Sequence, residues 1–195
     1  MDRDYNRIIK GIEQKRTVYG TLNFSETIQH LPTYDEIVCM ELFADVDLLD
    51  EIKQEVKRRG RWKELKETVK EAIKFVYEKF CWISSPKVVY LMDSGGGFYV
   101  FVHHRVTLPI SKRFNKKEKG QIFKELCKRF NNFLRAVREE AKQKVPNFEK
   151  TLKIDLLNNN NRQFKVIFSL HKTIDDTYVH PIDPQCIDFD EPPWP

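Results

Sequence analysis

The stretch EIVCMELFADVD, residues 36–47, decides the predicted fold. It is apolar, partly β-branched and closed by acidic residues, which is typical of a buried strand. Side chains two positions apart on a strand point to the same face, so Asp45 and Asp47 are expected to lie side by side. Two neighbouring carboxylates repel each other unless a cation lies between them, and this suits Mg²⁺ or Mn²⁺. From this pair alone, two solvated acids at a strand end remain the simpler alternative.

The rest of the chain predicts a mixture of strands and helices around this segment. A stretch of roughly 17–35 is expected to be rich in loops, and Pro109 is expected to end the second strand of a hairpin. Helices are predicted over residues 3–15, 48–58, 62–81 and 116–144, and further strands over 88–92, 98–106, 151–157, 164–170 and 177–182. Because strands and helices do not alternate regularly, the expected class is α+β, a largely antiparallel sheet with helices packed on it.

Composition limits the class of protein more than it identifies it. The chain has 195 residues, which suits one compact domain, or two tightly joined lobes, over residues 1–190. Residues 191–195 are expected to form a proline-rich tail or linker. A net charge of +5 permits an acidic partner without requiring one. With no apolar stretch of about 20 residues and no signal peptide, we expect a soluble, cytoplasmic protein without membrane contact.

Cysteine usage argues against a structural metal. The chain has four cysteines, and no two of them form a Cys-x-x-Cys pair. Zinc is therefore not expected, and reduced thiols that fill the core are the simpler interpretation.

A glycine-rich hairpin is predicted between the strands 88–92 and 98–106. Its sequence is Ser94-Gly95-Gly96-Gly97-Phe98-Tyr99. Three consecutive glycines expose backbone amides and let a bulky ligand approach closely, which suits a phosphate or a nucleic-acid backbone. A flexible turn is the alternative.

A basic segment, RQFKVIFSLHKT, begins at residue 162. Arg162, Lys165 and Lys172 can neutralise phosphate charge, and Ser169 and His171 can donate hydrogen bonds to phosphate oxygens. A basic edge strand with one surface histidine is the alternative. Asp155 precedes this segment, at the end of the predicted strand that contains LKID.

Taken in order, the segments FADVD, DSGGGFYVFV, KID and RQFKVIFSLHKT resemble the archaeo-eukaryotic primase superfamily. The resemblance covers roughly residues 36–190. It implies the sheet of a primase–polymerase catalytic core, which is similar to an RNA-recognition-motif fold, and a role in DNA replication. The implied activity is template-dependent nucleotidyl transfer that makes or extends primers on single-stranded DNA.

The resemblance also implies roles for individual residues. Asp45, Asp47 and Asp155 would be catalytic and would bind Mg²⁺ or Mn²⁺. The nucleoside triphosphate would be held by Ser94, Gly95, Gly96, Tyr99, Arg162, Lys165, Ser169, His171 and Lys172. Apart from the resemblance, the basic residues Arg58, Arg59, Arg61, Lys112 and Arg113 predict a surface along which the single-stranded template would lie, and solvated surface charge is the alternative for each of them. Replacing Asp47 by asparagine is expected to abolish activity with no loss of thermal stability, because it relieves repulsion.

The chain departs from the family pattern in two respects. Tyr99 stands where the family usually has a histidine, and His103 lies four strand residues, about 13 Å, further on. An alternative function is therefore a catalytically weakened, nucleic-acid-binding module of a replication assembly. The chain also lacks the zinc-binding or helical inserts of cellular primases. We expect initiation to need an accessory primase subunit or a further domain after residue 195.

Overall fold

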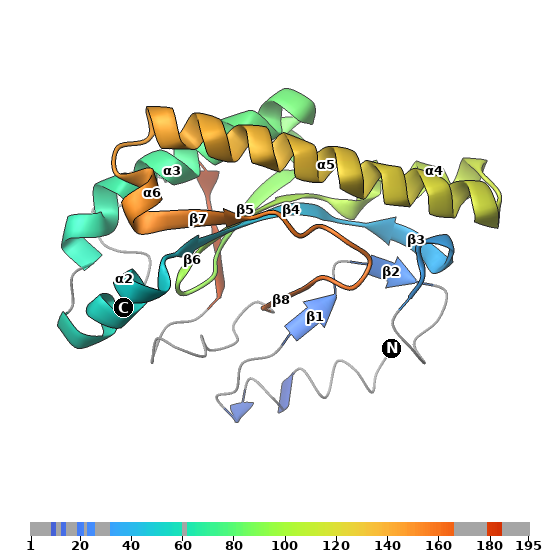
Figure 1. The fold of residues 1–195 in the computed structure, drawn as a ribbon. Helices are drawn as coiled ribbons and strands as arrows, with labels where there is room; N and C mark the ends of the chain where they lie inside the picture. The colour runs from blue at the N-terminus through green and yellow to red at the C-terminus, as the bar shows by residue number, and fades with distance from the viewer. Residues whose placement is uncertain are drawn as a thin grey trace.

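The fold is built on an antiparallel sheet that carries helices on one face (Figure 1). The computed structural model describes residues 9–10, 13–14, 19–21, 23–25, 32–59, 62–165 and 179–184. Within these residues the main sheet has five strands in the order β7-β4-β6-β5-β9, and each neighbouring pair is antiparallel. The strands are β4 (Leu42–Leu48), β5 (Val89–Asp93), β6 (Gly97–Val102), β7 (Leu152–Asp155) and β9 (His180–Ile182). The predicted α+β class with a largely antiparallel sheet is confirmed.

Two long helices cover one face of this sheet (Figure 1). They are α3 (Trp62–Ile83) and α5 (Lys116–Lys144), and α5 has the bounds that its apolar spacing predicts. The start of α5 is fixed by a capping box, because the Asn115 side chain accepts from the Glu118 N–H and the Glu118 carboxylate accepts from the Asn115 N–H. Shorter helices are α2 (Asp50–Arg59), α4 (Leu108–Arg113) and α6 (Phe148–Thr151). Helices α4 and α6 are too short for their periodicity to show in the sequence.

The alternation of β4 separates a face that packs on the helices from a second face, called the polar face, which carries Asp45 and Asp47 together with the buried Phe43. Leu42, Ala44, Val46 and Leu48 are buried in the same apolar cluster as the inward residues of α3 and α5. Each fully buried apolar side chain of this kind contributes about 1.5–3 kcal/mol. The intervening residues of β4 belong to the other face, so Asp45 and Asp47 lie on the side of the sheet away from the helices.

The segment 36–47 forms two strands rather than one. β3 (Ile37–Met40) ends before Glu41, and β4 begins at Leu42. β3 pairs with β2 (Asn23–Ser25), and β1 (Tyr19–Thr21) pairs with β8 (Gln163–Lys165). β1 and β2 lie inside the stretch expected to be loop-rich. Three-residue strands are held by partners distant in the sequence and leave no periodicity to detect.

Other boundaries differ from the predictions at strand ends. β6 ends at Val102, and residues His104–Val106 form the 3₁₀ turn η3 instead of continuing the strand. Two further 3₁₀ turns, η1 (Tyr34–Glu36) and η2 (Pro86–Val88), precede β3 and β5. Most of the predicted helix 3–15, and residues 166–170 and 177–178 of two predicted strands, lie outside the described residues.

Candidate functional site

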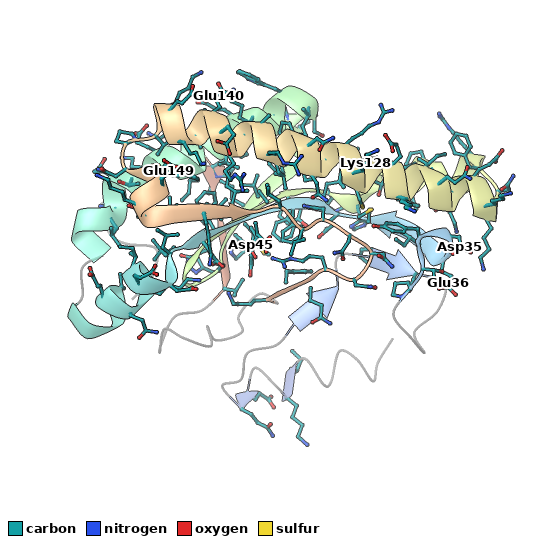
Figure 2. The ribbon with its side chains drawn as sticks, in the orientation of Figure 1. Asp35, Glu36, Asp45, Lys128, Glu140 and Glu149 are labelled. Carbon is teal, nitrogen blue, oxygen red and sulfur yellow. The ribbon has the colours of Figure 1, made fainter. Side chains whose placement is uncertain are left out.

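The three acids singled out in the sequence meet on the polar face of the sheet. Asp45 on β4 is the cross-strand partner of Asp155 on β7, and Asp47 follows Asp45 on the same face of β4. Figure 2 shows Asp45 on the side of the sheet away from α5. Their side chains are 14%, 24% and 35% exposed in the order Asp45, Asp47, Asp155, so the cluster is only partly open to solvent.

A guanidinium group bridges two of these acids. Arg162 Nη2 lies 2.8 Å from Asp45 Oδ2 and 2.6 Å from Asp155 Oδ2. These are short, charge-assisted contacts, and they offset much of the repulsion between the two carboxylates. The first basic residue of the predicted phosphate-binding segment therefore contacts the acids directly.

Arg162 is carried to this position by a loop that Asn158 anchors. Beyond the end of β7, the Asn158 amide accepts from the Phe43 N–H at 3.1 Å and donates to the Phe43 carbonyl at 2.8 Å. It thus takes the place of a strand residue beside β4. Asn131 on α5 holds the Asn158 backbone with two further hydrogen bonds. The loop is fixed to both layers of the fold, and this limits where Arg162 can reach.

Two carboxylate oxygens in the cluster are buried without a hydrogen bond. They are Asp45 Oδ1 and Asp47 Oδ1. Lys53 Nζ on α2 lies 3.2 Å from Asp47 Oδ1, close enough for an ion pair but without hydrogen-bond geometry. Buried polar atoms almost always have partners in native proteins, so Asp45 Oδ1 indicates a site for a cation or another ligand, whereas Lys53 already supplies a cation to Asp47 Oδ1.

The ionised form of Asp45 is disfavoured at its position in the fold. Burial, followed by the neighbouring Asp47 carboxylate, raises the pKa of Asp45 from 3.8 to about 7. Arg162 and Lys165 oppose this rise in pKa but do not cancel it. Because the ionised form of Asp45 is disfavoured here, an additional cation beside it would stabilise that form.

The chemistry of these residues fits a hard divalent cation, although their present arrangement does not yet enclose one. Carboxylate oxygens are the ligands that Mg²⁺ and Mn²⁺ prefer, and Asp45 and Asp47 each have an oxygen without a hydrogen bond. Across the described ranges, no three His, Cys, Asp or Glu side chains are grouped closely enough to hold a metal ion. Arg162 stands between Asp45 and Asp155, so a metal ion would replace its guanidinium.

The predicted hairpin forms between β5 and β6. The Ser94 N–H donates to the Gly97 carbonyl, and the Leu48 N–H at the end of β4 donates to the Gly96 carbonyl. Asp93 is fully buried at the start of the hairpin, accepts from the Gly95 N–H, and has a pKa well above its usual range because of that burial. The Ser94 hydroxyl is buried and lacks a hydrogen-bond partner. The three glycines are buried as well, so the backbone amides that the sequence predicted to be exposed are covered in the fold.

Gly97 has a role that differs from the one its sequence suggests. A Cβ atom at Gly97 would lie 2.0 Å from the Val46 carbonyl oxygen and 2.8 Å from Asp47 Cα. This glycine therefore allows β6 to approach β4 where β4 carries Asp47. Its absence of a side chain serves the sheet rather than a ligand.

Replacing Gly97 by alanine is expected to lower the free energy of unfolding by about 3 kcal/mol or more, because backbone atoms of β4 cannot move away cheaply. Urea unfolding followed by circular dichroism measures the loss. Gly96→Ala is the matched control, since the positive-φ glycines of the described chain are Gly95 and Gly97. Equal losses at both positions would contradict the close-approach argument.

Tyr99 is more deeply buried than a ligand-binding residue needs to be. It is 2% exposed, packs among Phe43, Phe101 and Met92, and is the cross-strand partner of Asp45. Burial, followed by the nearby carboxylates of Asp45 and Asp47, raises the pKa of its phenol far above the usual range. The Tyr99 side chain is therefore uncharged and packs beside the acids without binding them through a charge.

Lys165 is a second cation beside the acid cluster. It lies on β8, with Nζ 5.8 Å from the centre of the Tyr99 ring. Burial lowers the pKa of Lys165, and the carboxylates of Asp47 and Asp45 oppose that effect. Two predicted triphosphate ligands, Arg162 and Lys165, are therefore found on the polar face, next to the predicted metal ligands.

The remaining predicted residues divide by location. Lys112 and Arg113 are exposed at the end of α4. Arg58 and Arg59 close α2, but the description of this part of the chain covers their backbone only. Arg61, Ser169, His171 and Lys172 lie outside the described residues.

Three contributors to this region were not anticipated from the sequence. Lys53 pairs with Asp47, Asn158 positions the Arg162 loop, and His180 Nε2 on β9 lies 4.0 Å from Asp93 Oδ2. Lys53 and Asn158 come from segments with no recognisable motif. Only the pairing of distant elements brings them here.

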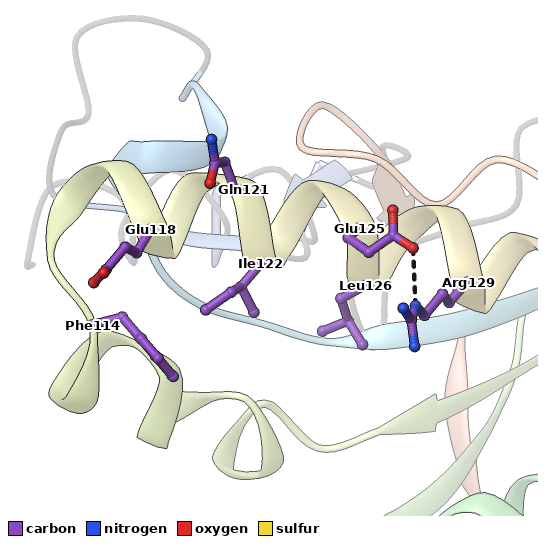
Figure 3. Close-up of a pocket in the computed structure, with 7 residues that line it drawn as sticks. All are labelled: Phe114, Glu118, Gln121, Ile122, Glu125, Leu126 and Arg129. Atoms are coloured by element: carbon purple, nitrogen blue, oxygen red, sulfur yellow. Dashed lines mark hydrogen bonds and ion pairs between the residues drawn. The ribbon is translucent and has the colours of Figure 1, made fainter.

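A separate groove lies on the helical side of the molecule and contains none of the acids. It is lined by Phe114, by the Glu125–Arg129 ion pair and by other residues of α5, as Figure 3 shows. Its lining is mainly apolar, and it shares no residue with the polar face.

Comparisons with models of known protein families, with curated proteins and with solved structures find no match for this chain. Along the described residues, no helix combines the length and apolarity needed to cross a lipid bilayer. The fold and its polar site define an α+β protein with acids and cations clustered on the face of an antiparallel sheet that lies away from the helices.

Proposed function

We propose that this chain is a template-dependent nucleotidyltransferase that makes or extends primers on single-stranded DNA with the help of divalent metal. One observation carries the proposal: Asp45, Asp47 and Asp155 lie on neighbouring strands and share one face of the sheet. The cations of Arg162 and Lys165 lie beside them, and two of the carboxylate oxygens have no hydrogen bond. Nucleotidyl transfer needs such a cluster, because the reaction depends on positioning and on neutralising phosphate charge.

In this proposal Asp45, Asp47 and Asp155 hold Mg²⁺ or Mn²⁺. The bound metal would neutralise the triphosphate and lower the pKa of the primer 3′-hydroxyl. Arg162 and Lys165 would then turn from the acids to the triphosphate oxygens. Ser169, His171 and Lys172, on the segment that follows, would bind the same triphosphate. Because Ser94 and the hairpin glycines are buried, this hairpin would have to move before its hydroxyl and amides could bind the same anion.

Arg162 gives this proposal a measurable consequence for metal binding. We expect Arg162→Gln to bind Mn²⁺ about 10-fold more tightly than the unaltered chain when no nucleotide is present, since the ion no longer has to displace a guanidinium from Asp45 and Asp155. Isothermal titration calorimetry with MnCl₂ measures this affinity.

Arg135→Gln is the control for that titration, because Arg135 is exposed on α5 and bonds Asn132 instead of an acid of the cluster. It should leave the Mn²⁺ affinity unchanged. Weaker Mn²⁺ binding by Arg162→Gln would contradict the idea that Arg162 occupies the metal position.

The proposed activity is tested by incubating the chain with labelled deoxynucleoside or nucleoside triphosphates, Mn²⁺, and primed or unprimed single-stranded templates. Template-dependent lengthening of the primer is the expected result. Product that forms without a template, or no product with any combination of nucleotide and metal, would count against it.

A second candidate is a nucleic-acid-binding module with weakened catalysis. Two observations favour it: Tyr99 is buried at the position where the family that the sequence resembles has a histidine, and Arg162 bridges Asp45 and Asp155. Such a module would bind single-stranded DNA but would not bind Mn²⁺ more tightly when triphosphate is added. The enzyme would bind single-stranded DNA and would also bind Mn²⁺ more tightly when triphosphate is added.

A further inference from the structure

The two histidines after β6 form part of a column of rings on the polar side of the sheet. The His103 and His104 ring centres are 4.1 Å apart, and Phe24 of β2 lies 4.5 Å from His104. On the inner side, His103 contacts the edge of Tyr90 at 6.1 Å, and Tyr90 stacks on Phe101 at 4.8 Å. The column runs without a break from the buried centre of the sheet to its surface.

The outer end of this column is exposed and apolar. Phe24 is 52% exposed. Val106, two residues after His104 in the sequence, is 46% exposed. An exposed phenylalanine ring supported by further rings beneath it offers a firm flat surface. Flat aromatic surfaces of this kind are where proteins stack the bases of single-stranded nucleic acids.

The charges around the column favour a base over a phosphate at the rings and a phosphate beside them. Glu41 lies 3.3 Å from His104 Nδ1, so the carboxylate repels a phosphate at that ring. His103 Nδ1 accepts from the Arg105 N–H, and burial, followed by the proximity of His104, lowers the His103 pKa. Arg105 is exposed directly after this pair and can meet a backbone phosphate.

The column is also on the correct face for a template. Its inner rings belong to the apolar cluster that includes Phe43 and Tyr99, and Tyr99 pairs with Asp45 across the sheet. His103 directly follows the end of β6 and is four residues from Tyr99, about 13 Å if the chain between them is extended. A strand of DNA bound at the column therefore passes within a few nucleotides of the acids.

We propose that Phe24 and His104 form a stacking site for a base of the single-stranded DNA template, with Arg105 contacting an adjacent phosphate. This inference rests on the proposed function for the identity of the strand as template. The stacking itself does not require catalysis. The site binds without reading sequence, because every base has a stacking face.

Fluorescence anisotropy of a labelled 20-nucleotide oligo-dT with the full chain tests the site. Phe24→Ala should weaken binding by roughly 5- to 150-fold, since stacking of one base on an aromatic ring has an energy of about 1–3 kcal/mol. Phe24→Tyr, which keeps the ring, should restore binding. Phe114→Ala is the matched control, because Phe114 is 43% exposed but lines the separate groove beside α5 (Figure 3).

An abasic strand of equal length separates stacking from charge. The unaltered chain should bind it as weakly as Phe24→Ala binds oligo-dT, and Phe24→Ala should cause no further loss. Arg105→Gln should instead reduce the slope of log affinity against log salt concentration by about one. Equal losses for Phe24→Ala and Phe114→Ala, or full affinity for the abasic strand, would overturn the proposal.

The same measurements distinguish this inference from the proposed function. If oligo-dT binding depends on the Phe24 ring but no condition gives nucleotide addition, the stacking site stands and the enzyme fails. If primers are extended while Phe24→Ala binds oligo-dT like the unaltered chain, the enzyme stands and the stacking site fails. A chain that binds no single-stranded DNA overturns the stacking site outright.

Discussion

Replacing Asp47 by asparagine is expected to lower the rate of nucleotide addition by at least about 10³-fold. The change removes one of the proposed metal ligands, and the charge that a bound metal neutralises in this reaction corresponds to several kcal/mol of the barrier. Primer extension with labelled nucleotides and Mn²⁺ measures the rate. An Asp47→Asn chain that retains most of its activity would remove Asp47 from the catalytic site.

The same substitution is expected to lower thermal stability, which differs from the expectation based on the sequence. Asp47 is the ion-pair partner of Lys53, whose side chain is only 9% exposed. Without this carboxylate, a nearly buried ammonium group loses its partner, at a cost of about 1–2 kcal/mol, or roughly 3–6 °C in melting temperature. The relief of repulsion with Asp45 offsets only part of this cost.

A double variant separates the two effects. Asp47→Asn combined with Lys53→Met removes the unpaired ammonium and should recover most of the lost stability, but it should not recover nucleotide addition. Differential scanning calorimetry and primer extension on the same samples make this comparison. Recovery of activity together with stability would show that Asp47 acts only through folding.

The sequence predicted well those parts of the fold that depend on local periodicity. Helix α5 has the predicted bounds, and β5 and β6 form the predicted hairpin around the glycines. The apolar alternation of β4 also places Asp45 and Asp47 on one face, as expected. The short strands β1, β2 and β8 were missed or only partly predicted, because their stability comes from partners far away in the chain.

The candidate site was predictable as a set of residues but not as an arrangement. The acids and Arg162 could be named from their motifs, whereas the contact of Arg162 with both Asp45 and Asp155 depends on the loop that Asn158 anchors to β4. Lys53 is one of many helical lysines in the sequence. Nothing in its local pattern distinguishes it from a solvated side chain, and only the approach of α2 to β4 reveals its role.

The stability of the metal-free chain is expected to fall as the pH rises from about 4 to about 7, because burial raises the pKa of Asp93 and of Asp45, and Asp45 is the one that can be assigned a range. Its folded-state pKa is raised to about 7, above the ordinary value of 3.8, so the folded chain binds this proton more tightly than the unfolded chain does. The resulting stabilisation is complete below the ordinary pKa and is lost as the pH passes the folded one. At 1.36 kcal/mol per pKa unit, the difference reaches up to about 4 kcal/mol.

Asp45→Asn cannot ionise, so its free energy of unfolding should change less with pH than that of the unaltered chain. Urea unfolding at pH 5, 6 and 8 without metal gives both slopes. Glu125→Gln is the control, because this exposed acid pairs with Arg129 outside the cluster and should leave the slope unaltered. Parallel slopes for Asp45→Asn and the unaltered chain would contradict the assignment.

Divalent metal should reduce this pH dependence, because a cation near Asp45 favours the ionised carboxyl and lowers its pKa. The proton on Asp45 and a metal ion thus compete for one carboxylate, so Mn²⁺ affinity should increase with pH up to about 7 and then level off. Calorimetric titration of MnCl₂ at the same three pH values checks this directly. A Mn²⁺ affinity that is equal at pH 5 and pH 8 would mean that Asp45 does not bind the metal.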